Sequence, residues 1–112
     1  MYRHCNVADW ASLRRAFADI GHVDIAVANA GVSQDGDFFA DELDDAGLLA
    51  EPRYTVIDVN LRAVLNFVKL SVSAFKRQQQ QGSTGGAIVL TSSATAYAPE
   101  LSLPVYSAVK LS

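Results

Sequence analysis

The first regular pattern along the chain is an apolar stripe at helical spacing. Asp9 is a good N-cap, because its carboxylate can accept from the free N–H groups of a first helical turn. Gly21 marks the stop, since glycine readily adopts the positive φ that ends many helices. Between them lie the members of the stripe, Trp10, Leu13, Phe17 and Ile20. The spacing predicts a helix of about three turns over residues 10–20.

Two short apolar runs have the character of buried strands. Residues 23–28 lead into an Asn-Ala-Gly turn (29–31), and residues 87–91 lead into a pair of serines (92–93). Branched side chains without polar alternation are typical of strands in a parallel sheet that is covered on both faces. Residues 2–7 are expected to form one further short strand.

The longest helix is expected over residues 54–78, where apolar side chains cover most of the circumference. Such a helix is buried on more than one side. One side is expected to meet the sheet and another a partner chain. Residues 78–86, four glutamines followed by Gly-Ser-Thr-Gly-Gly, are interpreted as a flexible loop without a function.

Strand and helix signals alternate along the chain, which favours an α/β fold with helices on both faces of a parallel sheet. In such sheets ligands bind outside the carboxyl ends of the strands. That rule selects residues 29–31 and 92–93 as the place to look for a site.

Composition and charge narrow the class of ligand. The 112 residues suffice for one small domain, and a 50% hydrophobic content allows a core. A net charge of −3 with scattered basic residues gives no footprint for nucleic acid. One cysteine excludes an internal disulfide, and no signal peptide or membrane-spanning run is found. A cytoplasmic protein with a small-molecule ligand, and with neither nucleic acid nor membrane as partner, is expected.

Residues 32–53 hold seven of the twelve acidic residues of the chain. Carboxylates bind metal ions when their spacing forms a ligand loop or when histidines join them, and neither condition is met here. We expect no metal site, and a solvated connection with one helical turn at 39–46.

Tyr106 and Lys110 are four residues apart and follow Pro104, which suits the first turn of a helix. Their side chains are therefore expected on one helix face. A phenol beside a fixed positive charge can exchange protons with a substrate, because the cation favours the phenolate. The spacing alone is also compatible with the edge of an amphipathic helix.

Three motifs in order link this pair to the strand ends. Asn-Ala-Gly follows one strand, Ser93 follows the next, and Ser93 lies 13 residues before Tyr106, which begins Tyr-x-x-x-Lys. The combination resembles the short-chain dehydrogenase/reductase family over nearly the whole chain. The resemblance implies a Rossmann-like, three-layer αβα fold with a parallel sheet, of which only the central part is present.

The resemblance also implies the catalytic roles. Tyr106 is the acid-base group, and Ser93 hydrogen-bonds the substrate oxygen. Lys110 favours the phenolate and binds the nicotinamide ribose. Asn60 matches the asparagine that holds a water in a proton relay to the lysine. Independently of the family, an asparagine inside an otherwise apolar helix must find a buried partner.

The implied cofactor is NAD or NADP, with Asn29, Ala30 and Gly31 lining the ribose. At Asn6 the chain departs from the family, which usually has an aspartate that accepts from the adenine amino group; an amide oxygen can also accept. Val7 is expected to contribute only its backbone. The choice between the two cofactors depends on the end of the second strand, which has no counterpart in this sequence.

The sequence contains no Gly-rich turn after a first strand, on which the family seats the pyrophosphate. By resemblance, residues 2–7, 23–28 and 87–91 are the third, fourth and fifth strands. Only the last two are neighbours in the order 3-2-1-4-5-6, which leaves an open apolar edge. We therefore expect residues 1–112 to be a single incomplete dinucleotide-binding domain, truncated at both ends.

Two hypotheses follow. In the first, the chain represents an NAD(P)-dependent oxidoreductase that transfers hydride between nicotinamide and a secondary alcohol or ketone, and whose complete form is a homo-oligomer, a dimer or tetramer. In the second, it is a non-catalytic truncated fragment or pseudoenzyme that at most pairs with a full-length relative through helix 54–76. A Gly-rich strand-turn-helix encoded upstream of Met1 would favour the first, and a nearby stop codon the second.

Overall fold

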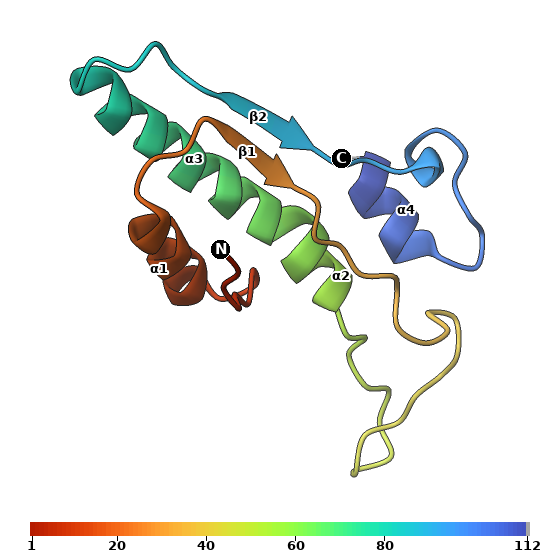
Figure 1. The fold of residues 1–112 in the computed structure, drawn as a ribbon. Helices are drawn as coiled ribbons and strands as arrows, with labels where there is room; N and C mark the ends of the chain where they lie inside the picture. The colour runs from red at the N-terminus through yellow and green to blue at the C-terminus, as the bar shows by residue number, and fades with distance from the viewer. Residues whose placement is uncertain (112) are drawn as a thin grey trace.

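A computed structural model describes residues 1–111, in which short strands and helices alternate (Figure 1). The elements are α1 (Trp10–Ile20), β1 (Ile25–Ala28), α2 (Thr55–Ile57), a π-helical turn (Asp58–Arg62), α3 (Ala63–Gln80), β2 (Ala87–Leu90), a 3-10 turn (Ala94–Ala96) and α4 (Pro104–Leu111). α2, the π-helical turn and α3 follow one another without a break, so residues 55–80 form one long helical segment with an irregular first part. The long helix predicted over residues 54–78 is confirmed and runs two residues further.

Both ends of α1 carry the predicted signals. The Asp9 carboxylate accepts from a backbone N–H of the first turn at 3.2 Å. Gly21 has φ 78°, and its N–H closes the last turn on the carbonyl of Phe17. Leu13 and Phe17, in the middle of the predicted stripe, are buried, whereas the two outer members of the stripe are 41% and 50% exposed. Only the middle of the stripe enters the core.

β1 and β2 pair in parallel, with Ile25 opposite Ala87. α3 runs along one face of this two-stranded sheet and contacts both strands (Figure 1). Ala26 is buried, while Ile25 and Val27, which project to the other face, are 64% and 53% exposed. The predicted α/β class with a parallel sheet is confirmed, and the helices of residues 1–111 cover one face of that sheet.

The core lies between α1 and the long helical segment. Phe17 packs edge to face against Phe67, with ring centroids 5.4 Å apart. The buried members of the cluster are Leu13, Phe17 and Ala74, and those packed around them are Cys5, Val7, Phe67 and Leu70. Through this cluster the N-terminal segment and α1 are attached to the middle of α3.

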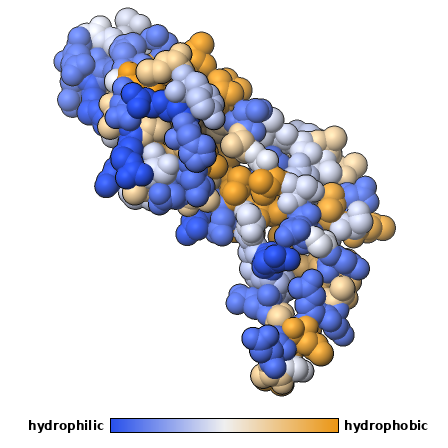
Figure 2. Space-filling view, turned by 60° about the horizontal axis from the view of Figure 1, so that its bottom comes forward, coloured by the Kyte–Doolittle hydropathy of each residue, from blue (hydrophilic) through white to orange (hydrophobic). Residues whose placement is uncertain are grey.

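The described residues are more extended than a compact domain of this length. Their radius of gyration is 17.5 Å and their extents are 59 × 33 × 22 Å, whereas a compact domain of similar size has a radius of gyration of about 13 Å. Hydrophobic residues reach the surface at several places along the molecule (Figure 2). This shape agrees with the predicted incomplete domain, which stays a prediction.

The strand predicted at residues 2–7 is wrong. The sheet of the described chain contains β1 and β2 alone, so this segment has no neighbouring strand with which to share hydrogen bonds. It turns instead at Asn6, whose carbonyl accepts from the N–H of Asp9 at 3.1 Å.

The helical turn predicted at 39–46 is also wrong. Asp44 Oδ1 accepts from the N–H groups of Ala46 and Leu48 at 2.9 and 3.0 Å, a local bonding pattern that competes with a helix. Leu43 and Leu49 form an antiparallel bridge across this turn. The acidic segment is therefore a tight reversal in an extended connection. In residues 1–111, no three metal-binding side chains gather into a candidate site.

None of the helices in the described part of the chain has the length and apolar character needed to cross a membrane.

Candidate active site

The loops that follow β1 and β2 lie side by side at one end of the sheet. The N–H of Thr91 donates to the carbonyl of Ala28 at 3.0 Å, which extends the ladder one step past β2. The Thr91 hydroxyl then donates to Asn29 Oδ1 at 3.1 Å. Parallel pairing thus brings Asn29 beside the segment that leads to Ser93, as the strand-end rule predicts.

Asn60 is 8% exposed in the π-helical turn, and its carboxamide faces the backbone of Val32. Its Oδ1 accepts from the Val32 N–H at 2.9 Å, and its Nδ2 donates to the Val32 carbonyl at 2.8 Å. The expected buried partner is therefore confirmed, and it is main chain. The N–H of Ala63 bonds five residues back to Asp58; single π-helical turns of this kind are frequent at functional sites.

Gly31 lies close to both Asn60 and Lys110. A Cβ atom on Gly31 would be 3.4 Å from Asn60 Oδ1 and 4.0 Å from Lys110 Nζ. Lys110 Nζ also donates to the Thr91 carbonyl at 3.5 Å, its single hydrogen bond within residues 1–111. The ammonium group therefore keeps N–H donors for a further acceptor such as a ribose hydroxyl.

Tyr106 and Lys110 occupy one face of α4, as their spacing predicts. Lys110 Nζ is 5.8 Å from the centroid of the Tyr106 ring, within the range of a cation–π contact. Both side chains are half-buried. A fixed positive charge thus lies beside the phenol on the side of the molecule where the two strands end.

Ser93 begins the 3-10 turn after β2, and its hydroxyl is engaged locally. It accepts from the Thr95 N–H at 3.4 Å and from the Thr95 hydroxyl at 3.1 Å. Within residues 1–111 no hydrogen bond joins Ser93 to Tyr106. Its role as the substrate anchor stays a prediction.

Two contacts that hold α4 have no counterpart in the sequence analysis. Ser107, 5% exposed, accepts through its hydroxyl from the N–H of Glu100 at 3.0 Å and so fixes the preceding loop. Gln34 Oε1 accepts from the N–H groups of Val105 and Tyr106 at 2.9 and 3.4 Å. Ser107 acts on the loop seven residues before it, and Gln34 acts on a helix 71 residues away, so the pattern around Gln34 gives no sign of its contact.

Asn6 and Val7 lie apart from this cluster, in the N-terminal segment. Asn6 Oδ1 accepts from the N–H of Ala8 at 3.1 Å, a turn within its own segment. Val7 packs its side chain on the core cluster, and its expected backbone contribution to cofactor binding stays a prediction. A groove of about 730 Å³ is lined by Val7, Asn29 and Ala30 together with the open edge of β1.

The residues present fit one end of a dinucleotide. The Lys110 ammonium group has free N–H donors, and the exposed loop 29–31 next to it consists of small residues. Together they suit a ribose. The glycine turn that would seat the pyrophosphate does not occur in the sequence. The donors and small residues of the cluster suit a ribose, and the described residues offer no comparable seat for a pyrophosphate.

Comparison with known proteins agrees with this geometry. The family model described as short chain dehydrogenase matches residues 1–112. The chain belongs to the short-chain dehydrogenase family. Its sequence is 52% identical over 105 residues to the short-chain dehydrogenase/reductase prx4 of Penicillium rubens. The aligned residues make up 94% of this chain and 31% of that protein. With ATR7 of Stachybotrys chlorohalonatus, also named a short-chain dehydrogenase/reductase, the identity is 47% over 110 residues, or 97% and 33% of the two chains.

The chain thus spans about a third of the length of these short-chain dehydrogenase relatives. Among solved structures, it resembles an alcohol dehydrogenase from the archaeon Thermococcus sibiricus complexed with 5-hydroxy-NADP. The TM-score is 0.73 at 25% identity, over 99% of this chain and 43% of that one. The Rossmann-like class predicted from the sequence is therefore confirmed, as is family membership.

Proposed function

We propose that this chain carries the proton-transfer part of an NAD(P)-dependent oxidoreductase site that interconverts a secondary alcohol and a ketone. The observation that carries the proposal is the placement of Gly31 close to both Asn60 and Lys110, with Lys110 Nζ 5.8 Å from the centroid of the Tyr106 ring. Membership of the short-chain dehydrogenase family and the nicotinamide cofactor derivative bound by the Thermococcus sibiricus relative support it.

In the direction of reduction, bound NADH or NADPH would supply the hydride that reaches the carbonyl carbon. Tyr106 gives its phenolic proton to the carbonyl oxygen, so that the ketone becomes an alcohol; oxidation reverses both transfers. Lys110 favours the phenolate that is left, because a cation stabilises a nearby anion. The Ser93 hydroxyl, which accepts from Thr95, keeps its own hydrogen and donates it in a hydrogen bond to the same oxygen.

The remaining assigned residues hold the cofactor and return the proton. Lys110 donates to the nicotinamide ribose, beside the loop formed by Asn29, Ala30 and Gly31. Asn60 keeps one amide hydrogen and a second Oδ1 lone pair beyond its bonds to Val32, enough to hold a relay water. In this proposal Asn6 accepts from adenine through the second lone pair of its Oδ1, and the backbone of Val7 lies beside it.

The experiment for this proposal is Tyr106→Phe in the full-length product of the gene. Turnover of cyclohexanone or acetophenone with NADH or NADPH is expected to fall to nearly nothing, because the proton donor is removed. Cofactor binding, followed by titration calorimetry, is expected to be unchanged, since the ring and Lys110 stay in place. Retained turnover in this variant would contradict the assigned chemistry.

The alternative is that the 112-residue chain alone is non-catalytic and pairs with a full-length relative through residues 54–76. It is favoured by the exposure of Leu65 (62%) and Val72 (39%) on α3. In the complete enzyme the same surface is proposed to join copies into a homo-oligomer.

A titration of the 112-residue chain with NADH and NADPH tests the non-catalytic alternative. We expect no saturable binding, because the sequence has no glycine turn to hold a pyrophosphate. Micromolar binding would show that the chain by itself seats the cofactor, and would contradict the non-catalytic alternative. Folding of the titrated chain is checked by far-UV circular dichroism.

A further inference from the structure

Gln34 is the first residue past the Asn-Ala-Gly loop that reaches α4. It lies three positions after Gly31, and its Oε1 accepts from Val105 and Tyr106, 71 and 72 residues further along the chain. The first N–H groups of a helix have no partner within the helix. Gln34 supplies that partner from a different part of the chain, at the residue that carries the acid-base phenol.

The loop after β1 is thereby attached to two helices at once. Val32 is held by Asn60 on the long helical segment, through both its N–H and its carbonyl. Gln34, two residues later, is held by the N-terminus of α4. Gly31 of the same loop lies next to Lys110 Nζ. The loop therefore links the ribose side of the site to the helix that carries Tyr106.

We propose that Gln34 is a positioning residue that fixes Tyr106 relative to the Asn-Ala-Gly loop by accepting from the N-terminal N–H groups of α4. This inference rests on the proposed function, since positioning has meaning only if Tyr106 transfers a proton. Catalysis by a fixed acid-base group is sensitive to displacements of about 1 Å. A helix that shifts or rotates against the loop moves the phenol away from the substrate.

A second observation separates this role from ordinary stabilisation. The Gln34 Nε2 atom is buried and has no hydrogen-bond partner among residues 1–111. Burying an unpaired amide donor is unfavourable, and an apolar side chain of similar length would avoid that penalty. In this chain Gln34 thus supplies an acceptor at the helix terminus and also buries an unpaired donor that destabilises the fold.

The test compares Gln34→Met with Gln34→Glu in the full-length gene product. Methionine fills similar space without an acceptor, and glutamate keeps an oxygen at the helix terminus. For Gln34→Met we expect kcat to fall about ten- to hundred-fold while the KM for NADH or NADPH stays within about twofold. The melting temperature is expected to change little, because removing the unpaired Nε2 donor offsets the loss of an acceptor for two helix N–H groups. Gln34→Glu is expected to recover most of kcat.

Three outcomes of these measurements would contradict the inference or the proposed function. If Gln34→Met turns over cyclohexanone like the parent while Tyr106→Phe is inactive, the positioning role is wrong and the proposed function stands. If Tyr106→Phe is active, the proposed function itself fails. If kcat and the melting temperature of Gln34→Met fall together and Gln34→Glu recovers neither, Gln34 serves the fold and not the placement of Tyr106.

Discussion

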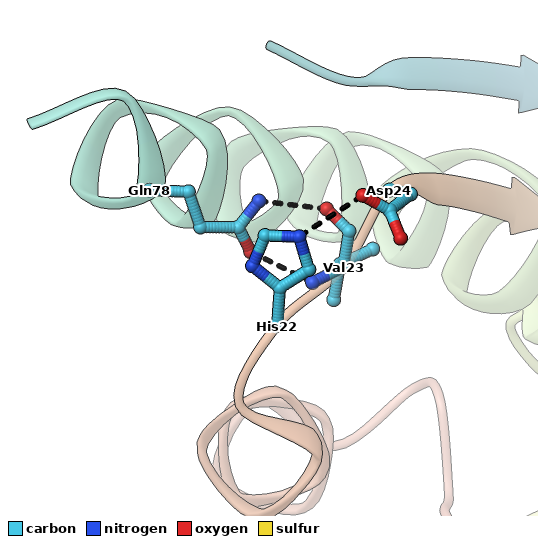
Figure 3. Close-up of polar contacts among 4 residues, drawn as sticks. All are labelled: His22, Val23, Asp24 and Gln78. Atoms are coloured by element: carbon cyan, nitrogen blue, oxygen red, sulfur yellow. Dashed lines mark hydrogen bonds and ion pairs between the residues drawn. The ribbon is translucent and has the colours of Figure 1, made fainter. Parts of the chain in front are cut away.

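The two ends of the helical segment 55–80 use the same bonding arrangement for different purposes. At one end Asn60, 8% exposed, pairs its carboxamide with both backbone groups of Val32, at 2.9 and 2.8 Å. At the other end Gln78, 5% exposed, does the same with Val23, at 2.7 Å for each bond (Figure 3). Val23 precedes β1 and Val32 follows it, so the two carboxamides hold the strand along the helix from both sides.

What differs is the surroundings of each carboxamide. At the Asn60 end the helix is π-helical, and Gly31 lies close to both the Asn60 carboxamide and Lys110 Nζ. At the Gln78 end the helix is regular, and the neighbouring polar groups are His22 and Asp24, an exposed pair at 2.9 Å (Figure 3). The same two hydrogen bonds hold the amino end of β1 without a proposed site beside them, whereas at the carboxyl end, where parallel sheets bind ligands, they belong to the site that we propose.

The largest effect is expected from Asn60→Leu. It leaves the N–H and carbonyl of Val32 without partners, which costs about 2–4 kcal/mol of unfolding free energy. The loop that places Gly31 beside Lys110 also loses its anchor, so turnover is expected to fall about 100-fold or more. Urea unfolding and steady-state kinetics of the full-length gene product measure the two effects. A variant that is destabilised but fully active would show that Asn60 is not part of the catalytic site.

The matched substitution at the other end is Gln78→Leu, with a smaller overall effect. It breaks the two bonds to Val23 and is expected to lower the unfolding free energy by about 2–3 kcal/mol. At a temperature where the variant is folded, kcat is expected to stay within about twofold of the parent, because the site lies at the opposite end of the strand. A large loss of kcat would show that the two ends are coupled through β1.

Sequence reasoning found one of these carboxamides and missed the other for a physical reason. Asn60 interrupts an apolar helix, so its burial and its need for a partner are readable locally. Gln78 belongs to a run of four glutamines and was assigned to a loop without function, yet it lies in the last turn of α3, buried against Val23. Its partner is 55 residues away, and nothing in the run distinguishes it from its neighbours.

Elements with a local sequence signal were predicted, and elements that depend on a distant partner were not. Residues 25–28 and 87–90 are strands because their apolar branched side chains favour burial wherever a sheet forms. Residues 2–7 have a similar length but no adjacent strand in the described chain, and strand formation depends on that partner. The Tyr106–Lys110 face followed from helical spacing alone, whereas the support from Gln34 depends on a contact across 72 residues.

The smallest expected effect, and the sharpest test of the Gln78 end, comes from Gln78→Glu. An ionised carboxylate can accept from the Val23 N–H but cannot donate to the Val23 carbonyl, so a bond is lost and two acceptors face each other. The protonated carboxyl can donate, which raises its pKa in the folded state above the ordinary value of about 4.3. The stability of the variant relative to the parent is therefore highest below the unfolded-state pKa and is lost as pH rises through the folded-state pKa.

Near neutral pH we expect this variant to be about 1–2 kcal/mol less stable than the parent in urea unfolding. Near pH 4 the deficit is expected to be largely recovered, and the parent measured at each pH corrects for all other titrating groups. A deficit that does not change with pH would mean that the side chain at this position turns away from Val23 in solution. In that case the two ends of the helix would not hold β1 in the same way, and the bonds of Asn60 alone would set the position of the strand.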